Sequence, residues 1–490
     1  MKLSLVSLTR EEATPPISLG YLAAALNRDL PEVEVDIIDG NYGSLMGSIK
    51  RSRPDVVGIS AMTVHYNQAR RVAELVKTKL GLPVILGGVH ISTHTKSFDR
   101  CFDVGVIGEG ELTLVELLGS YLSNGRRFDP QSLREVQGLI YWEDGNPVQT
   151  PPRPLIGDMD SISRPDWSLF NPRYTRPAQS IFLERVKAVQ VSLLSARGCP
   201  YKCIFCSTSK HWHRVRFYSA NYVADEIEYL IRTLDADIIS FWDDLFTINK
   251  SRLAEIADEL ERRGLLGTVK FCVLGRMETM DEEVCRILKK MGVININFGF
   301  ESGSDRILKY LKKHKKISVD HAKNAVRLCN QFGFSVSGSF MMGSPGEKRE
   351  DLMKTVELID WMASQPSVFD LWLFTTSPLP NTELWDLGIE KGLIDEEDYD
   401  FDFSSQYSQY PLFLDESIPL SDFQEIYQLA ESKMAGISPF KKTSYKIGRA
   451  LRDPRILLPA IKRRLFVYNK LSFMIKKRQK GSLGHTRQAN

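Results

Sequence analysis

The chain has 490 residues, of which 43% are hydrophobic, and its net charge is only +3 from 64 basic and 61 acidic residues. This length permits two or three domains with their own cores, and the composition excludes a disordered or fibrous protein. The balanced charge gives no electrostatic argument for a nucleic-acid partner. No segment approaches the ~18 uninterrupted apolar residues of a membrane span, and the N-terminal apolar run is too short for a signal peptide, so we expect a cytoplasmic protein.

The first part of the chain alternates short apolar strands with amphipathic helices. Strands are expected at KLSLVSL, VEVDIID, DVVGISA, PVILGGVH and DVGVIG, with helices between them, including one over Gln68–Leu80. This alternation is typical of a parallel sheet wound with helices, so residues 1–145 are predicted to form a Rossmann-like domain. Residues 146–188 are rich in Pro, Asp and Arg without a sustained period, and we interpret them as an ordered linker.

A second series of strands and helices follows over residues 189–400. Helices are expected at Ala220–Leu234, Ser251–Arg263, Asp281–Met291, Val319–Phe332 and Lys348–Met362, each followed by an apolar strand. These make about six βα units, fewer than the eight of a full barrel, so the fold class is α/β with a partial TIM barrel as the second domain. Functional residues are then expected at the C-terminal ends of its strands. Residues 401–490 are predicted to form a small, mostly helical segment.

Three of the seven cysteines, Cys199, Cys203 and Cys206, lie in a loop directly after the first barrel strand, with the spacing C-x3-C-x2-C. Three thiolates leave one iron of a [4Fe-4S] cubane open, and the amino and carboxylate groups of S-adenosylmethionine (SAM) can chelate that iron. The alternative is a zinc site, for which His211 or His213 would supply the fourth ligand. The remaining cysteines are interpreted as small buried apolar residues.

The cysteine spacing, with Phe205 before the last cysteine, resembles the signature of the radical SAM superfamily. The segments FWDDLF, GRMETMDEEVCRILKKMGV, FGFESGSDRIL, SGSFMMGSPGE and TSPLPNTELW are similar to recurrent superfamily segments in the expected order. By position the resemblance implies SAM contacts at Asp243, Asp244, Arg276, Glu301 and Ser302, and a backbone approach to its adenosine at Gly343 and Pro345. From the residues alone, the alternative for Arg276 and Glu301 is an ion pair inside the barrel, and the alternative for the glycine is turn chemistry.

The N-terminal domain resembles the cobalamin-binding domain of one radical SAM subfamily. The segments that carry the resemblance are PPISLGYLAAAL, DIIDG, GISAMT, LGGVH and GEGE, which follow strands at the open edge of the sheet. Cobalamin contacts are implied at Ser60, Thr63, Gly87, Gly88, His90, Glu109, Gly110 and Glu111. On physical grounds alone such a sheet could hold a flavin or nothing. No D-x-H-x-x-G segment is present, so base-off cobalamin without a histidine ligand is expected, and His90 is interpreted more simply as a loop histidine with a backbone hydrogen bond.

The segment from Lys441 onward is dense in Lys and Arg with interleaved apolar residues. A basic amphipathic helix of this kind suits an anionic membrane surface, and the alternative is a solvated helix with one face packed on the barrel. Peripheral membrane contact would favour a lipid-like substrate.

The leading functional hypothesis is a radical SAM enzyme that methylates an unactivated carbon of a small-molecule or lipid-like substrate with cobalamin as methyl donor. The alternatives are a cyclase or rearrangement enzyme with the same cofactors, and a non-catalytic cofactor-binding or zinc-stabilised protein. The resemblance also implies an electron donor such as flavodoxin or ferredoxin. General acid and base residues cannot be named from the sequence.

Overall fold

The computed structural model describes residues 1–8, 15–179, 187–212, 214–397, 399–401, 411–435 and 437. The basic tail from Lys441 onward and His213 lie outside these residues, so the membrane hypothesis stays a prediction. Within the described part of the chain, no helix combines the length and apolar character needed to cross a bilayer.

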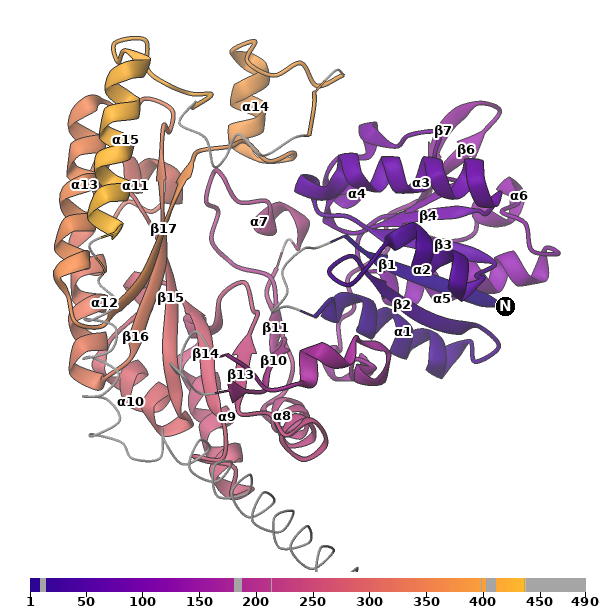
Figure 1. The fold of residues 1–490 in the computed structure, drawn as a ribbon, viewed down its shortest axis with the longest axis horizontal. Coiled ribbons are helices and arrows are strands. Elements are labelled where there is room, and N and C mark those ends of the chain that lie inside the picture. The colour runs from indigo at the N-terminus through magenta and orange to yellow at the C-terminus, as the bar shows by residue number, and fades with distance from the viewer. Residues whose placement is uncertain are drawn as a thin grey trace, which may run out of the picture.

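The N-terminal domain is built on a seven-stranded sheet, and the barrel domain lies beside it (Figure 1). Its strand order is β2-β1-β3-β4-β5-β6-β7, and the first five strands pair in parallel. β6 and β7 add an antiparallel hairpin at the edge. The strands are β1 (Lys2–Ser7), β2 (Glu34–Asp39), β3 (Val56–Ser60), β4 (Val84–Gly87), β5 (Val104–Val106), β6 (Leu139–Glu143) and β7 (Asn146–Gln149).

Helices cover both faces of this sheet, as expected for a doubly wound fold. They are α1 (Ile17–Asp29), α2 (Leu45–Ser52), α3 (Tyr66–Leu80), α4 (Val89–Thr93), α5 (Gly110–Ser123) and α6 (Pro130–Leu133). Each face has its own apolar core, because the strands are buried on both sides. The predicted boundary at residue 145 falls inside the β6–β7 turn, so the sheet extends four residues further, to Gln149.

The second domain contains the predicted partial barrel. Its six parallel strands follow the chain order, from β10 to β17. They are β10 (Gln190–Leu193), β13 (Ile238–Phe241), β14 (Lys270–Gly275), β15 (Val293–Glu301), β16 (Ser335–Met342) and β17 (Val368–Thr375). The intervening helices are α8 (Ala220–Leu234), α9 (Lys250–Arg262), α10 (Glu282–Met291), α11 (Asp305–Lys312), α12 (Val319–Phe332) and α13 (Arg349–Ser364).

The two faces of the barrel sheet differ in chemistry. On β15, Ile296, Phe298 and Phe300 belong to the apolar core under the helices. Asn295 and Asn297 alternate with them and therefore point to the barrel interior, because successive side chains of a strand face opposite sides. This alternation positions polar groups inside the barrel and keeps the helices on an apolar surface.

The linker between the sheets is ordered where the structure describes it. It contains the short turns η3 (Met159–Ser161), η4 (Trp167–Leu169) and η5 (Pro172–Thr175). Trp167, Phe170 and Tyr174 are buried in the barrel core, and the Tyr174 hydroxyl donates a hydrogen bond to Asp39 of the N-terminal domain. The linker is thus a packed connection between the domains.

After β17 the chain leaves the barrel and returns to the N-terminal domain. Residues 376–401 include α14 (Glu383–Glu390) and place Trp385 and Phe401 in a core cluster of the N-terminal domain. We call this segment the aromatic strap. The expected barrel boundary at residue 400 is therefore too late, because the strap packs on the other domain. The last described helix, α15 (Leu420–Ala435), lies beside α13 (Figure 1).

Candidate functional site

The three motif cysteines lie on the loop between β11 (Ala196–Arg197) and α7 (Thr208–His211). All three thiols are free and half-buried. The Cys206 amide donates to the carbonyl of Cys203 at 3.2 Å, which turns the loop back on itself. Burial raises the pKa of the Cys199 thiol to about 11, so a free thiol is neutral here and binding of iron would displace its proton.

The residues around the three thiols bear on whether the loop would hold an iron–sulfur cluster or a single metal ion. Among the described residues, no three His, Cys, Asp or Glu side chains are grouped closely enough to hold one metal ion. The chemistry of the donors fits a cluster, because three thiolates would bind three irons of a cubane and leave the fourth open. The zinc alternative gains no support from His211, and His213 lies outside the described residues.

Arg276, at the end of β14, lies against the cysteine loop. Its Nη1 donates to the Cys203 Sγ at 3.4 Å, and its Nε donates to Glu278 at 2.5 Å. The guanidinium stacks over the Tyr201 ring at 3.6 Å, and its buried Nη2 has no hydrogen-bond partner among the described residues. A buried donor without a partner beside three thiols fits an anionic group at this position, since buried donors are normally satisfied.

The two predicted aspartates at the end of β13 have different surroundings. Asp243 is fully buried and accepts hydrogen bonds from the Ser195 amide and hydroxyl and from the Ala196 amide. Burial raises its pKa to about 6, and these bonds hold the strand end that leads into the cysteine loop. Asp244 accepts from the Gly198 amide at 2.9 Å and from Thr208 at 3.0 Å. Asp243 thus anchors the strand end that precedes the cysteine loop, whereas Asp244 lines the cavity between the two domains.

Glu301 and Ser302, at the end of β15, are held by neighbours inside the domain. Glu301 accepts from the buried Lys312 at 3.1 Å, and Arg276 pairs with Glu278, so each residue has an ion-pair partner inside the domain other than the one that the alternative interpretation named. Its φ of +64° lies in the left-handed region, which is unusual for a residue other than glycine. Ser302 is buried and its hydroxyl lies 3.2 Å from the Thr355 hydroxyl. Both are placed at a strand end, but Ser302 points into the protein.

Gly343 and Pro345 follow β16 in a tight turn. Gly343 has a φ of +78°, and a Cβ there would lie 2.3 Å from Pro411. The amides of Gly343 and Ser344 both donate to Glu347 Oε2, at 2.7 and 2.9 Å. The glycine is therefore required by the turn and by Pro411, in agreement with the turn-chemistry interpretation, and Pro345 is half-buried beside it.

A cavity of about 600 Å³ lies between the two domains. One wall carries the strand-end loops of the N-terminal sheet, and the other carries the cysteine loop and α7, which lies between the sheets in Figure 1. Of the predicted cobalamin contacts, Ser60, Gly87, Gly88, Glu109, Gly110 and Glu111 line it. Met62 and Trp242 present large apolar side chains to it and keep 44% and 46% of their surface exposed. Exposed apolar surface inside a cavity suits a large flat ligand.

The cavity also reaches into the N-terminal domain. Leu5, Ile85 and Leu114, which belong to the core between the sheet and α1 and α5, line this arm. Gly88 (φ +98°) is required beside it, because a Cβ would lie 2.6 Å from the carbonyl oxygen of Ala61. An apolar arm fits the nucleotide tail of base-off cobalamin, the form that the absence of a D-x-H-x-x-G segment predicts.

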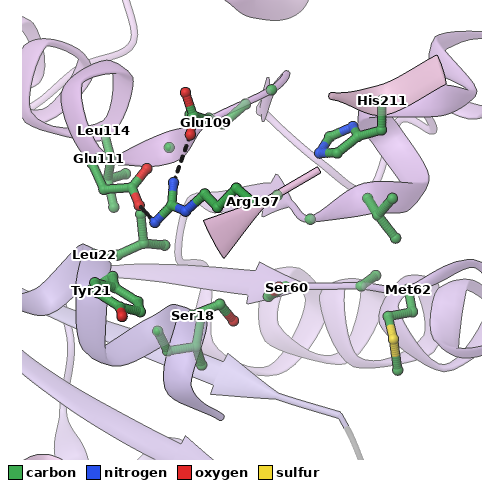
Figure 2. Close-up of a pocket in the computed structure, with 18 of the residues that line it drawn as sticks. Ser18, Tyr21, Leu22, Ser60, Met62, Glu109, Glu111, Leu114, Arg197 and His211 are labelled. Carbon is green, nitrogen blue, oxygen red and sulfur yellow. Dashed lines mark hydrogen bonds and ion pairs between the residues drawn. The ribbon is translucent and has the colours of Figure 1, made fainter. Parts of the chain in front are cut away.

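Glu109 and Glu111 form ion pairs across the domain boundary. Arg197 donates to Glu109 and to Glu111, each at 2.6 Å (Figure 2). Arg216 donates to Glu109 at 2.8 Å. All four side chains are buried; we call them the arginine junction. Burial alone would raise the pKa of Glu109, but the hydrogen bond from Arg216 and the charge of Arg197 hold it below its usual value. The junction fixes the cysteine loop, because Arg197 is two residues before Cys199.

Thr63 and His90 do not line the cavity. His90 is fully buried, its ring stacks on Tyr66 at 4.0 Å, and its Nε2 lies 2.8 Å from the Ser97 hydroxyl. Burial lowers its pKa to about 3, so it is neutral. The expected hydrogen bond therefore goes to a side chain rather than to the backbone, and the structure gives no support to cobalamin ligation by His90.

Several residues that line the cavity were not indicated by the sequence motifs. Tyr21, Met62, Arg197, Trp212 and Trp242 line the cavity, and Figure 2 shows Met62 and His211 on opposite sides of it. Trp242 stands inside the FWDDLF segment, so its position at a strand end was the available signal. Nothing local marks Arg197 as the partner of two glutamates more than 80 residues away.

Comparison with known proteins decides the family. The family model of the B12 binding domain matches residues 3–118, and that of the radical SAM superfamily matches residues 193–359. An uncharacterised methyltransferase of Pyrococcus horikoshii is 33% identical over 393 residues, which cover 78% of this chain and 80% of that protein. The chain belongs to the cobalamin-binding radical SAM enzymes. Its cofactors are accordingly a [4Fe-4S] cluster, SAM and cobalamin.

Two further relatives extend the comparison within this family. An anaerobic magnesium-protoporphyrin IX monomethyl ester cyclase of Cereibacter sphaeroides is 29% identical, over 76% of this chain and 60% of the cyclase. The solved structure of the methyltransferase TsrM from Kitasatospora setae, with cobalamin and a [4Fe-4S] cluster bound, superposes with a TM-score of 0.65 at 19% identity, covering 89% of each chain. The likeness to the TsrM structure supports the two-domain fold of this cobalamin-binding radical SAM enzyme.

Proposed function

We propose that this protein is a methyltransferase that cleaves SAM reductively and transfers a methyl group to an unactivated carbon of a small-molecule substrate. The observation that carries the proposal is the single cavity bounded by the cysteine loop and by the N-terminal strand ends. Ser207 and Thr208 line it next to Cys206, and Ser60 and Met62 line it from the other domain. One substrate bound in this space can reach both cofactors.

Different residues of the chain would hold the cluster, tune its reduction potential and exclude water. Cys199, Cys203 and Cys206 would hold the cluster, which supplies the electron for SAM cleavage, and Asp244 fixes the loop through the amide of Gly198. Arg276 donates to a cluster sulfur ligand, a contact of the kind that tunes reduction potential. Trp242 and Met62 would exclude water from the space where a carbon radical has to persist.

Anaerobic reconstitution with iron, sulfide and cobalamin tests this proposal. A methyltransferase forms 5'-deoxyadenosine and S-adenosylhomocysteine together, because one SAM is the radical source and a second is the methyl source. Cys203→Ala should abolish cluster absorption and both products. Cys285→Ala is the matched control, because Cys285 is fully buried in the apolar barrel core, and it should keep both. Four irons per wild-type chain with no SAM cleavage would instead indicate a non-catalytic protein.

A cyclase is the second candidate, because a relative named as a cyclase matches three quarters of the chain. It would form 5'-deoxyadenosine without S-adenosylhomocysteine. The same assay therefore separates the two activities.

A further inference from the structure

The cysteine loop has a second side, which faces away from the cavity. Ile204, between Cys203 and Cys206, donates its amide to the carbonyl of Leu311 at 2.9 Å and accepts at its own carbonyl from the Leu384 amide at 3.2 Å. The loop is thereby attached to α11 and to α14. Between these helices lies a surface groove of about 500 Å³, with Ile204 among its lining residues.

Two exposed lysines, Lys309 and Lys313, line this groove, and further exposed lysines lie close to them along the chain. The segment 306–316 reads RILKYLKKHKK, and its exposed members are joined by Lys202 of the cysteine loop itself. We call these exposed lysines the α11 patch; they are Lys202, Lys309, Lys313, Lys315 and Lys316. The exposed aromatic ring of Tyr310 lies among them and also lines the groove.

The opposite wall of the groove is acidic. It contains Glu383, Asp386 and Glu390 of α14, and Glu383 is paired with Lys313 at 2.6 Å. The groove itself is lined by three carboxylates and two lysines, so the excess positive charge lies on Lys309 and, beside the groove, on Lys315 and Lys316 in the loop that follows α11. A partner that uses this field must be acidic and must sit over α11 rather than over α14.

A chain of contacts leads from the patch to a cluster ligand. The His314 ring, in the patch loop, lies 6.4 Å from the Tyr201 ring at an interplanar angle of 77°. Tyr201 is stacked under Arg276, whose Nη1 contacts Cys203 Sγ. The covalent route from Cys203 to the groove is a single residue long, through Ile204. This face of the protein is thus connected to the cysteine loop both by the chain itself and by stacked rings.

We propose that the α11 patch is the docking site of a small acidic electron-transfer protein that reduces the cluster. The inference rests on the proposed function only through the need for one electron per SAM cleaved. The donor protein is oxidised by one electron, and that electron breaks the C5'–S bond of SAM to give methionine and a 5'-deoxyadenosyl radical. The substrate and cobalamin occupy the cavity side of the loop, so the donor can bind while they are present.

The size and composition of the patch suit a transient complex. Redox partners form small interfaces that exchange quickly, and their association depends on charge more than on apolar area. A central aromatic residue with a charged rim is the usual anatomy of such an interface, and Tyr310 surrounded by lysines has this form.

The test uses the full-length reconstituted enzyme and a purified acidic flavodoxin. Titration calorimetry at low and high salt should show that Lys309→Glu/Lys316→Glu raises the Kd for flavodoxin about tenfold and flattens its salt dependence, because attraction between surface charges is screened within ~8–10 Å. The matched control is Lys50→Glu/Lys79→Glu, which reverses two exposed lysines in the last turns of α2 and α3, on the other domain. It should leave the Kd unchanged.

A variant of opposite sign sharpens the test. Glu390→Lys removes a negative charge from the acidic wall and should tighten flavodoxin binding several-fold. Equal weakening by the patch and control variants, or weaker binding by Glu390→Lys, would overturn the proposal.

Dithionite separates docking from catalysis. With this small reductant, Lys309→Glu/Lys316→Glu should form 5'-deoxyadenosine at the wild-type rate, whereas with flavodoxin it should be slower. A matching loss with dithionite would mean that the variant damages the cysteine loop, and the docking assignment would fall. If the wild type cleaves no SAM with dithionite, the proposed function fails, while the calorimetric result still decides the docking site.

Discussion

Two of the connections between the domains are held by different physical means. Near the cysteines, the arginine junction uses two buried carboxylates and two buried guanidinium groups. The aromatic strap uses packing instead, with Trp385 and Phe401 packed against Tyr66 and His94. Ion pairs with fixed geometry determine orientation, whereas apolar packing contributes stability without strong directional preference. The directional contacts lie where the cofactors must be aligned.

Breaking the arginine junction should have the largest effect. Glu109→Gln leaves Arg216 and one arm of Arg197 buried without a countercharge, which costs roughly 3–5 kcal/mol of unfolding free energy. Thermal unfolding and cobalamin retention on gel filtration measure the result, and both should decrease. Glu116→Gln is the control, because its partner Arg153 forms a pair in which Glu116 is half exposed, and it should cost about 1 kcal/mol or less. Similar losses from both variants would show that the junction has no special role.

Truncating a side chain of the strap should lower the free energy of unfolding by slightly less than Glu109→Gln does, and salt should affect this loss differently. Trp385→Ala removes a side chain that is only 2% exposed, at an expected cost of about 3 kcal/mol, since the strap can partly relax into the space. Chemical denaturation at low and high salt provides the measurement. The loss should be independent of salt, unlike any effect at exposed ion pairs, and a strong salt dependence would contradict the packing interpretation.

The difference between local signals and contacts that are remote along the chain explains which features the sequence could predict. Helices such as Ala220–Leu234 and Val319–Phe332 match the expected bounds, because periodicity and caps are local signals. The spacing of the cysteines is also a local signal, so the cysteine loop could be predicted in the same way. The junction and the strap were not predictable, because each joins residues that are remote along the chain, such as Glu109 with Arg197 or Lys96 with Glu396. For the same reason the sequence could not show that Asp243 and Ser302 are buried against their own domain, and a contact of either residue with SAM stays a prediction.

Acid should weaken the strap side first. Burial lowers the pKa of His90 to about 3 and also lowers that of His94, which faces Glu396, Lys96 and His90. Both pKa values lie below the value of about 6.5 in an unfolded chain, so the unfolded state binds protons at a pH where the folded state does not. Stability is unaffected above pH 6.5 and falls as the pH drops toward 3, by up to about 1.4 kcal/mol per pH unit for His90.

Thermal unfolding of wild type and His90→Asn between pH 8 and 5 measures this slope. The asparagine keeps a polar group near Ser97 but cannot titrate, so the variant should lose part of the pH dependence. An unchanged slope would assign the acid sensitivity to other groups.

The smallest effect is expected at the rim of the strap, where Lys96 pairs with Glu396 at 2.5 Å. The Lys96 side chain is 70% exposed, so water and salt already screen most of the attraction, and holding two long side chains together costs entropy. Lys96→Ala should therefore shift the melting temperature by no more than the error of a thermal scan, and 0.5 M salt should abolish even that shift. Glu396 also lies 3.5 Å from His94, so the variant should make protonation of His94 slightly easier and reduce the pH slope by a small amount. A shift as large as that of Trp385→Ala would mean that charge, and not packing, holds the strap, and the distinction between the two junctions would disappear.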